Sequence, residues 1–184
     1  YEIDLELRIV PAPADDAAPE RAALEDYSRR DAAAIASFYE LKFDDPGSQP
    51  TVGICQLAER ALVATSNKVA AAVEIGAALW AGDYQTLSKL PLVSDTLAAE
   101  ERETGRRERE ALGHYLGGML YFAGEWYWGV DRLPYLEERL IQAGLQRSGH
   151  RQVAQFQSRP AAMSKPAQRR LKLEFYPSIR SPYS

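Results

Sequence analysis

Cysteine and histidine are scarce: the 184 residues include one cysteine and two histidines. A single thiol, Cys55, cannot form an intrachain disulfide, and a dithiol oxidant would need a second cysteine. Its apolar helical neighbours predict a buried, inert thiol, with a reactive thiol as the alternative. His114 and His150 are too few and too isolated for an ordinary zinc site, so we expect no metal. We expect His114 to pack at a helix end, with a role as a base as the alternative.

The sequence also lacks an excess of positive charge and a long hydrophobic run. Its net charge is −4 and its pI is about 5.3, which argues against a nucleic-acid partner. The charged run Glu101–Glu110 is typical of a solvated helix face. The most apolar stretch, Val69–Gly82, contains Glu74 and is too short to cross a bilayer. We therefore expect no membrane partner and a cytoplasmic protein. The first residue is Tyr1 rather than Met, which indicates that a segment precedes it.

The first part of the chain predicts a strand followed by helices. Residues Tyr1–Val10 alternate apolar and polar side chains, as in a strand with one covered face. Residues 18–114 then predict helices, with breaks at turn-forming residues. The expected helices cover about 19–39, 54–64, 67–81, 83–90 and 94–114. Ser66, Asp83 and either Ser94 or Asp95 are candidate N-caps.

Residues 115–144 predict a β-hairpin and an amphipathic helix. Two aromatic runs flank Ala123-Gly124, and Gly124 would supply the positive φ of a tight turn. In the helix, Asp131 is the expected N-cap and Val130 the partner of Tyr135 in a hydrophobic staple. Gly144 would end it. The polar residues 145–170 are typical of a linker, and a second strand is expected at Leu171–Tyr176.

Two motifs resemble one protein family. Met119–Leu140 (MLYFAGEWYWGVDRLPYLEERL) is similar to the closing hairpin and helix of DsbA-like thioredoxin-fold proteins. The branch it resembles is that of 2-hydroxychromene-2-carboxylate isomerase and the kappa-class glutathione transferases. Residues 173–184 (LEFYPSIRSPYS) resemble the opening strand of that family and its Ser-Pro-Tyr-Ser helix start.

The resemblance implies an α/β fold: a thioredoxin-like sheet with an inserted all-helical domain. Residues 1–17 and 115–144 would form the thioredoxin-like part, and residues 18–114 the insertion. Residues 171–184 would begin a second thioredoxin-like domain of a tandem protein, or supply the strand that completes the first. In the second case the strand would pair with Glu2–Val10 and with the hairpin, in its own chain or by strand exchange in a homodimer.

The resemblance also implies a site for glutathione. Ser181 would stabilise the glutathione thiolate, although a serine before proline is also an ordinary helix N-cap. Asp131 would hold the γ-glutamyl amino group, with simple N-capping as the alternative. The family's cis-proline before the hairpin strand is replaced by Gly118, so the backbone of Gly118 and Met119 would face the ligand, and we expect a trans Gly117–Gly118 bond.

Four aromatic residues are candidates for an apolar substrate pocket, with core packing as the alternative. They are Trp80, Tyr84, Trp126 and Trp128. The resulting hypothesis is a glutathione-dependent isomerase or transferase-type enzyme that acts on apolar or aromatic small molecules and is not a CxxC dithiol oxidant. The alternative is a non-catalytic thioredoxin-fold module that serves in dimerisation or supports a catalytic domain.

Overall fold

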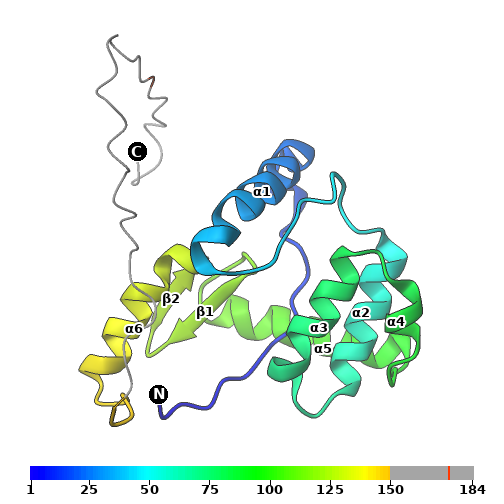
Figure 1. The fold of residues 1–184 in the computed structure, drawn as a ribbon. Coiled ribbons are helices and arrows are strands. Elements are labelled where there is room, and N and C mark those ends of the chain that lie inside the picture. The colour runs from blue at the N-terminus through cyan, green and yellow to red at the C-terminus, as the bar shows by residue number, and fades with distance from the viewer. Residues whose placement is uncertain (150–173, 175–184) are drawn as a thin grey trace.

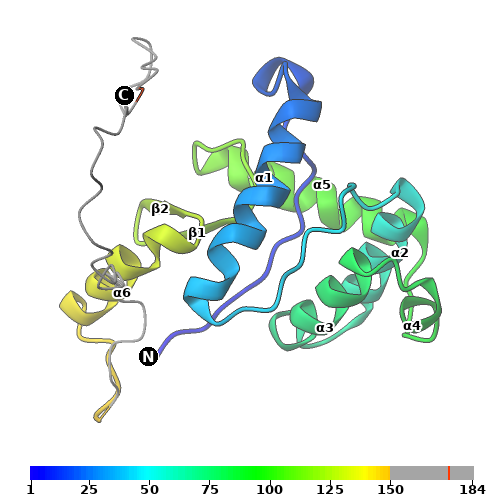
Figure 2. The ribbon, with the colours of Figure 1, turned by 45° about the horizontal axis from the view of Figure 1, so that its top comes forward.

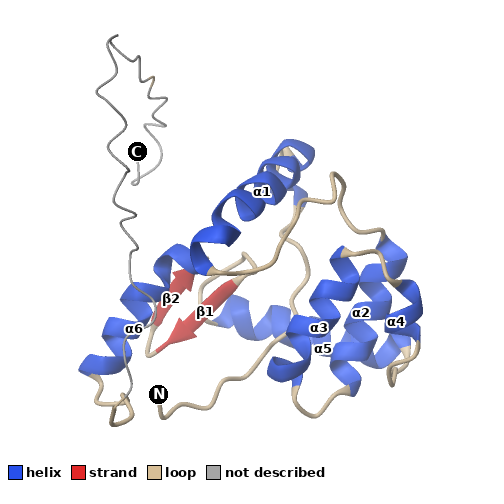
Figure 3. Ribbon diagram, in the orientation of Figure 1, coloured by secondary structure: helices blue, strands red, loops and turns tan. Residues whose placement is uncertain are grey.

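The computed structural model describes residues 1–149 and residue 174. In this part of the chain the protein is mixed α/β and mainly helical, with one antiparallel sheet of two strands (Figures 1 and 3). Three short 3-10 helices, Asp15–Ala17, Ser37–Tyr39 and Val130–Arg132, accompany the main elements. The α-helices and strands are α1 (Arg21–Ala36), α2 (Val52–Ala64), α3 (Lys68–Trp80), α4 (Tyr84–Ser88), α5 (Asp95–Ala111), β1 (Met119–Phe122), β2 (Glu125–Trp128) and α6 (Leu133–Gln142).

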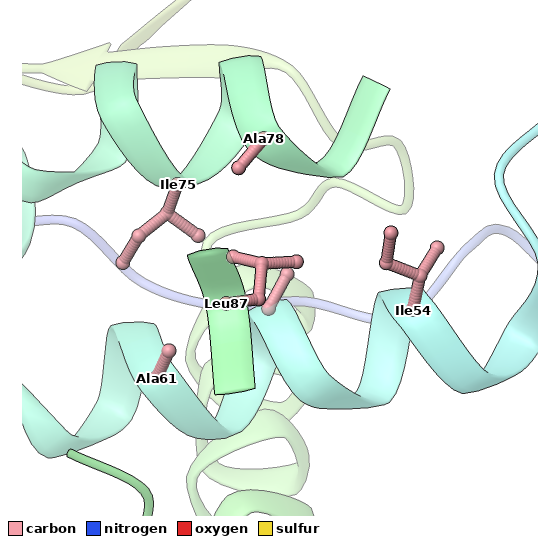
Figure 4. Close-up of a cluster of buried hydrophobic side chains, with 6 residues drawn as sticks. Ile54, Ala61, Ile75, Ala78 and Leu87 are labelled. Carbon is pink, nitrogen blue, oxygen red and sulfur yellow. The ribbon is translucent and has the colours of Figure 1, made fainter. Parts of the chain in front are cut away.

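The main hydrophobic core lies between α2, α3 and α4. Ile54 and Leu87 are its most buried large side chains, with exposed fractions of 1% and 0%. Alanines of α2 and α3 surround them and let the helices approach closely (Figure 4). The helical segments that the apolar periodicity predicts between residues 52 and 111 are confirmed.

Side-chain caps begin the helices of this block, because the first backbone N–H groups of a helix lack intrahelical partners. The side chains of Asp83 and Ser94 accept hydrogen bonds from the N–H groups of Thr86 and Leu97, which confirms both predicted caps. Ser66 was predicted to cap α3, and this was wrong by one position, because the N-cap is Asn67. Serine and asparagine serve equally well as caps, so composition alone does not choose between neighbours.

The predicted hairpin and closing helix are confirmed. Strand β1 pairs with β2 in antiparallel register, and α6 packs against β2. The turn places Ala123 at φ 49° and Gly124 at φ 90°, so both turn residues have the positive φ that tight hairpins need. Gly144, at φ 73°, ends α6, and the N–H of Leu145 donates to the carbonyl of Leu140. This is the pattern of a glycine-terminated helix.

The N-terminal strand was predicted wrongly. Residues 1–10 form no strand, and Ile3 and Leu5 are 44% and 52% exposed. The segment leads from a point near α6, past α5, to α1 (Figures 1 and 2). It is held at its ends: the Tyr1 hydroxyl donates to Glu137, and Arg8 pairs with Glu108 of α5. Alternation predicts which side chains share a face, but a strand also needs a neighbouring strand, and the described residues provide none beside this segment.

Close contact with α5 fixes the end of this segment. A Cβ atom at Gly105 would lie 2.1 Å from the carbonyl oxygen of Ile9. Real Cβ atoms do not approach a backbone oxygen so closely, so glycine is required in the middle of this helix although it lowers helix propensity.

Gly105→Ala should therefore separate the N-terminal segment from α5. We expect a loss of about 1–3 kcal/mol of unfolding free energy, as for an overpacked core, although alanine favours the helix. Chemical denaturation followed by circular dichroism measures this. Gly76→Ala is the matched control, since Gly76 also lies inside a helix and a Cβ there meets nothing within 4 Å. An equal gain of stability in both variants would show that the contact with Ile9 does not constrain the fold.

Most of the predicted linker, the second strand and Ser181 lie outside the described residues. Glu174, in the middle of the predicted strand Leu171–Tyr176, is described: it is exposed and belongs to no strand. The other residues of the predicted strand lie outside the described part of the chain, so the strand stays a prediction. Within the described part of the chain the sheet consists of β1 and β2, without the strand that was expected to complete it.

Candidate functional site

One face of the hairpin is lined by large side chains and is incompletely covered. The register pairs Met119 with Trp128 and Tyr121 with Trp126, and directly paired residues of antiparallel strands lie on the same face. Trp128 is 61% exposed and Tyr121 is 41% exposed. The opposite face carries Tyr127, which is 8% exposed. Tyr127 therefore packs in the core, and the open face holds the two predicted pocket residues Trp126 and Trp128. We call this open face, made by Met119, Tyr121, Trp126 and Trp128, the aromatic face.

The loop after α5 extends the aromatic face. The His114 ring stacks on Tyr115 at a centroid distance of 5.5 Å and lies 5.2 Å from the Trp126 ring. The His114 Nδ1 atom accepts the backbone N–H groups of Tyr115 and Leu116. The expectation of a packing residue at a helix end is confirmed. The contribution of Tyr115 was missed, because one aromatic residue in a loop gives no periodic signal.

The open end of the hairpin brings together the three residues predicted to bind the cofactor. Gly129 donates a long hydrogen bond of 3.5 Å to the carbonyl of Gly118, beyond the last strand pair of Met119 and Trp128. Asp131 follows two residues later. Its Oδ1 atom lies 2.9 Å from the position of a Cβ on Gly129, so the carboxylate folds back toward the hairpin end. Glycine is required at position 129 both by this contact and by its φ of 74°.

Asp131 does not cap α6, so that prediction was wrong. It lies inside a 3-10 turn, Val130–Arg132, and the N-cap position of α6 is Arg132, without a side-chain capping hydrogen bond. Helix α6 begins later, at Leu133, with Pro134 in its first turn. The Asp131 carboxylate is 67% exposed and is 3.6 Å from the Arg132 guanidinium. An exposed carboxylate that no backbone N–H uses is available to a cationic group of a ligand.

The backbone at Gly118 differs from that of a cis-proline. The Gly117–Gly118 bond is trans, as expected, and Gly118 has φ 67°, a conformation that favours glycine. Gly118 is exposed and Met119 is half-buried. The backbone of Gly118 is thus accessible at the hairpin end, and its trans bond and positive φ differ from the geometry of a cis-proline.

The structure does not bring all four predicted pocket residues together. The ring of Trp80 makes an edge contact with Phe43, with centroids 5.3 Å apart. The Tyr84 hydroxyl lies 2.6 Å from the hydroxyl of Thr51, at the start of α2. Trp80 lines a cavity beside α1, whereas Trp126 lines another cavity between β2 and α6. The sequence identifies aromatic residues, but only the packing of the helices decides which of them share a cavity.

The cavity between β2 and α6 has a volume of about 520 Å³ and a partly polar wall. Here the Tyr127 hydroxyl donates to Glu125, and Arg139 lies 3.3 Å from the same carboxylate. Burial of the phenol, and next its hydrogen bond to Glu125, raise the pKa of Tyr127 to about 12. Because this pKa lies above that of an unfolded chain, the stabilisation is complete below about pH 10 and is lost as the pH rises through about 12.

Tyr127→Phe should remove one of the phenols that ionise late when tyrosinate absorbance is followed against pH. The exposed Tyr27 is the matched control, and Tyr27→Phe removes one phenol without touching the pair of Tyr127 and Glu125. Tyr1, whose pKa is also raised to about 12, mainly by burial, contributes to the same component. If Tyr127→Phe instead lost tyrosinate absorbance only near pH 10, the raised pKa of Tyr127 would be contradicted.

The thiol of Cys55 was predicted to be buried, and this was wrong: it is exposed. Partial desolvation, and next the Glu59 carboxylate, raise its pKa and so favour the unreactive thiol. Helix α2 turns Cys55 away from the core that Ile54 enters, because adjacent residues on a helix lie on different faces.

The described residues include no group of three acidic, histidine or cysteine side chains placed to hold a metal ion. No helix in the same part of the chain has the length and apolarity needed to cross a membrane. No family model, curated protein or solved structure matches the sequence or the fold.

Proposed function

We propose that the protein is a DsbA-like, thioredoxin-fold type protein whose hairpin end binds glutathione, and that it acts as an isomerase or transferase-type enzyme on apolar or aromatic small molecules. One observation carries the proposal: an exposed carboxylate, Asp131, and the accessible backbone of Gly118 beside Met119 lie at the one open end of the hairpin. The similarity of residues 119–140 to the family supports it.

The residues at the hairpin end fit a peptide-like ligand. The Asp131 carboxylate can pair with the ammonium of a γ-glutamyl group, since a charge-assisted hydrogen bond is stronger than a neutral one. The Gly118 carbonyl accepts one long hydrogen bond from Gly129 and has a second lone pair that can accept from a ligand amide. Glutathione would supply a thiol nucleophile. We propose that Ser181 stabilises the glutathione thiolate, which is the role that the resemblance to the family implies for this serine.

The apolar substrate would contact the aromatic face. This face begins at the same hairpin end, because Trp128 is paired with Met119. The exposed ring of Trp128 offers a stacking surface to a planar substrate. Without a second cysteine the protein cannot cycle between a dithiol and an intrachain disulfide.

A glutathione titration followed by amide NMR shifts tests the proposal. We expect saturable shifts at Gly118, Met119 and Asp131, and about tenfold weaker binding for Asp131→Asn, which loses the charge but keeps the shape. Asp4→Asn is the matched control, because Asp4 is an exposed carboxylate of the N-terminal segment. Unchanged affinity in Asp131→Asn would remove Asp131 from the site, and the absence of saturable shifts would remove glutathione.

The backbone of Gly118 favours a second candidate, a non-catalytic module for dimerisation or support of a catalytic domain. Its trans bond and φ of 67° do not reproduce the presentation of backbone groups by a cis-proline. The exposed Tyr121 and Trp128 would then serve as an association surface. Sedimentation at increasing concentration distinguishes the candidates, since Trp128→Ser would weaken self-association in the second and leave the mass unchanged in the first.

A further inference from the structure

A second cavity lies beside α1, away from the hairpin. It has a volume of about 280 Å³ and is bounded by α1, the end of the N-terminal segment, the loop before α2 and the last residue of α3. It shares no lining residue with the cavity between β2 and α6, and none with the aromatic face. An inference about this cavity is therefore independent of the proposed glutathione site.

The size and walls of the cavity fit a small planar molecule. Its walls are mainly apolar, with Leu24 and Ala32 of α1 facing the aromatic pair of Phe43 and Trp80. These two rings are nearly perpendicular, at 89°, so they offer a ring face and a ring edge to an occupant. An apolar protein cavity of about 150 Å³ accommodates benzene, and this one is roughly twice as large, which corresponds to one or two fused rings.

The two guanidinium groups of the wall are already compensated, and the remaining charged lining residue, Glu25, is itself anionic. Arg29 pairs with Asp26 and Asp45 at 2.9 Å in each case, and Arg21 pairs with Asp15 at 2.8 Å. Because each guanidinium has a carboxylate partner, the wall offers no uncompensated positive charge to an anion. Placing an anionic ligand in this mainly apolar space would cost desolvation without a free counter-charge. Ser28 also lines the cavity, and a serine hydroxyl can donate to or accept from a neutral polar group.

Hydrogen bonds hold the walls in place before any ligand binds. Asp45 accepts both from Arg29 and from the N–H of Gly47, which fixes the loop against α1. The Gln49 amide donates to the carbonyl of Glu25 and closes the far side of the loop. A cavity held open in this way does not require the ligand to order its walls, so less affinity is lost on binding.

We propose that this cavity binds a neutral, planar aromatic molecule of one or two rings that carries a hydroxyl or carbonyl oxygen. The rings lie against Phe43 and Trp80, and the oxygen is bonded by Ser28 or by the edge of a guanidinium group. The neutral charge distinguishes this ligand from an aromatic carboxylate of the same shape.

Trp80 reports on the occupant directly. The chain has three tryptophans, so the double variant Trp126→Phe, Trp128→Phe leaves Trp80 as the sole one. We expect 2-naphthol to quench its fluorescence saturably, and 2-naphthoate, a charged molecule of similar shape, to bind at least about tenfold more weakly. Both titrations are performed without glutathione, so that the outcome does not depend on the hairpin site.

Filling the cavity tests its location. In the same background Ala32→Leu should abolish the saturable quenching, whereas Ala34→Leu, the same change at an exposed position of the same helix, should not. Circular dichroism verifies that both variants are folded. If Ala32→Leu does not fold, Ser28→Ala, which should weaken 2-naphthol binding, replaces it. Quenching that is absent in the folded parent, or equal in the Ala32 and Ala34 variants, would overturn the cavity as a site. Tighter binding of 2-naphthoate than of 2-naphthol would overturn the inference that the ligand is uncharged.

Discussion

Leu87→Ala should lower the free energy of unfolding by about 2–5 kcal/mol, the range for truncation of a buried leucine. We expect a value in the upper half of that range, because the side chain is 0% exposed and lies between α2 and α3. Helix α4 has five residues and cannot be stable alone, so Leu87 is its main attachment to the core. Loss of this attachment should also release the end of α3.

Chemical denaturation followed by far-UV circular dichroism measures the effect. Leu92→Ala is the matched control, since Leu92 is 36% exposed beyond α4, and we expect a change within about 0.5 kcal/mol. Similar losses in the two variants would mean that the packing of α4 contributes no more than an ordinary surface contact.

Arg29→Ala should lower the free energy of unfolding by about 2–3 kcal/mol and detach the loop before α2 from α1. Breaking a buried ion pair typically costs about 3–5 kcal/mol. A smaller value is expected here because the carboxylates left behind are not fully buried: Asp45 is 21% exposed and Asp26 is 50% exposed. The same variant should weaken 2-naphthol binding, because the cavity beside α1 would lose the bond that positions its loop.

The neighbouring residue provides the control. Arg30 also pairs with Asp26, but its side chain is 65% exposed, so Arg30→Ala should cost less than about 1 kcal/mol. Equal losses for Arg29→Ala and Arg30→Ala would show that burial of the Arg29 guanidinium adds nothing to its ion pairs.

The same loop should respond to acid. The N–H of Gly47, and next the Arg29 guanidinium, lower the pKa of Asp45. A lowered pKa means that the stabilisation is present above the ordinary carboxyl pKa and is lost as the pH falls through the folded value. Arg29→Ala should therefore lose less stability than the parent protein between neutral and acid pH.

The sequence by itself determined the local elements of this protein. The turn at Ala123-Gly124, the end of α6 at Gly144 and the caps Asp83 and Ser94 were predictable, because each depends on residues within a few positions of one another. The hairpin register then follows from the two-residue turn, and it alone placed Gly118, Met119 and Trp128 at one end.

Only the tertiary structure decided which distant segments meet. Alternation in residues 1–10 is compatible with a strand, yet strand formation depends on a partner that no local pattern reveals. The sequence grouped Trp80 and Trp126 as candidates for one pocket, but they lie in different surroundings. Trp80 packs on Phe43, and Trp126 lies by Leu112 at the end of a different helix. No local pattern indicated that Arg29 is buried, because a charged side chain is expected to be exposed. Its burial depends on contact with carboxylates that are distant in the sequence, such as Asp45. Local chemistry sets the elements, and the packing of non-adjacent segments sets the cavities.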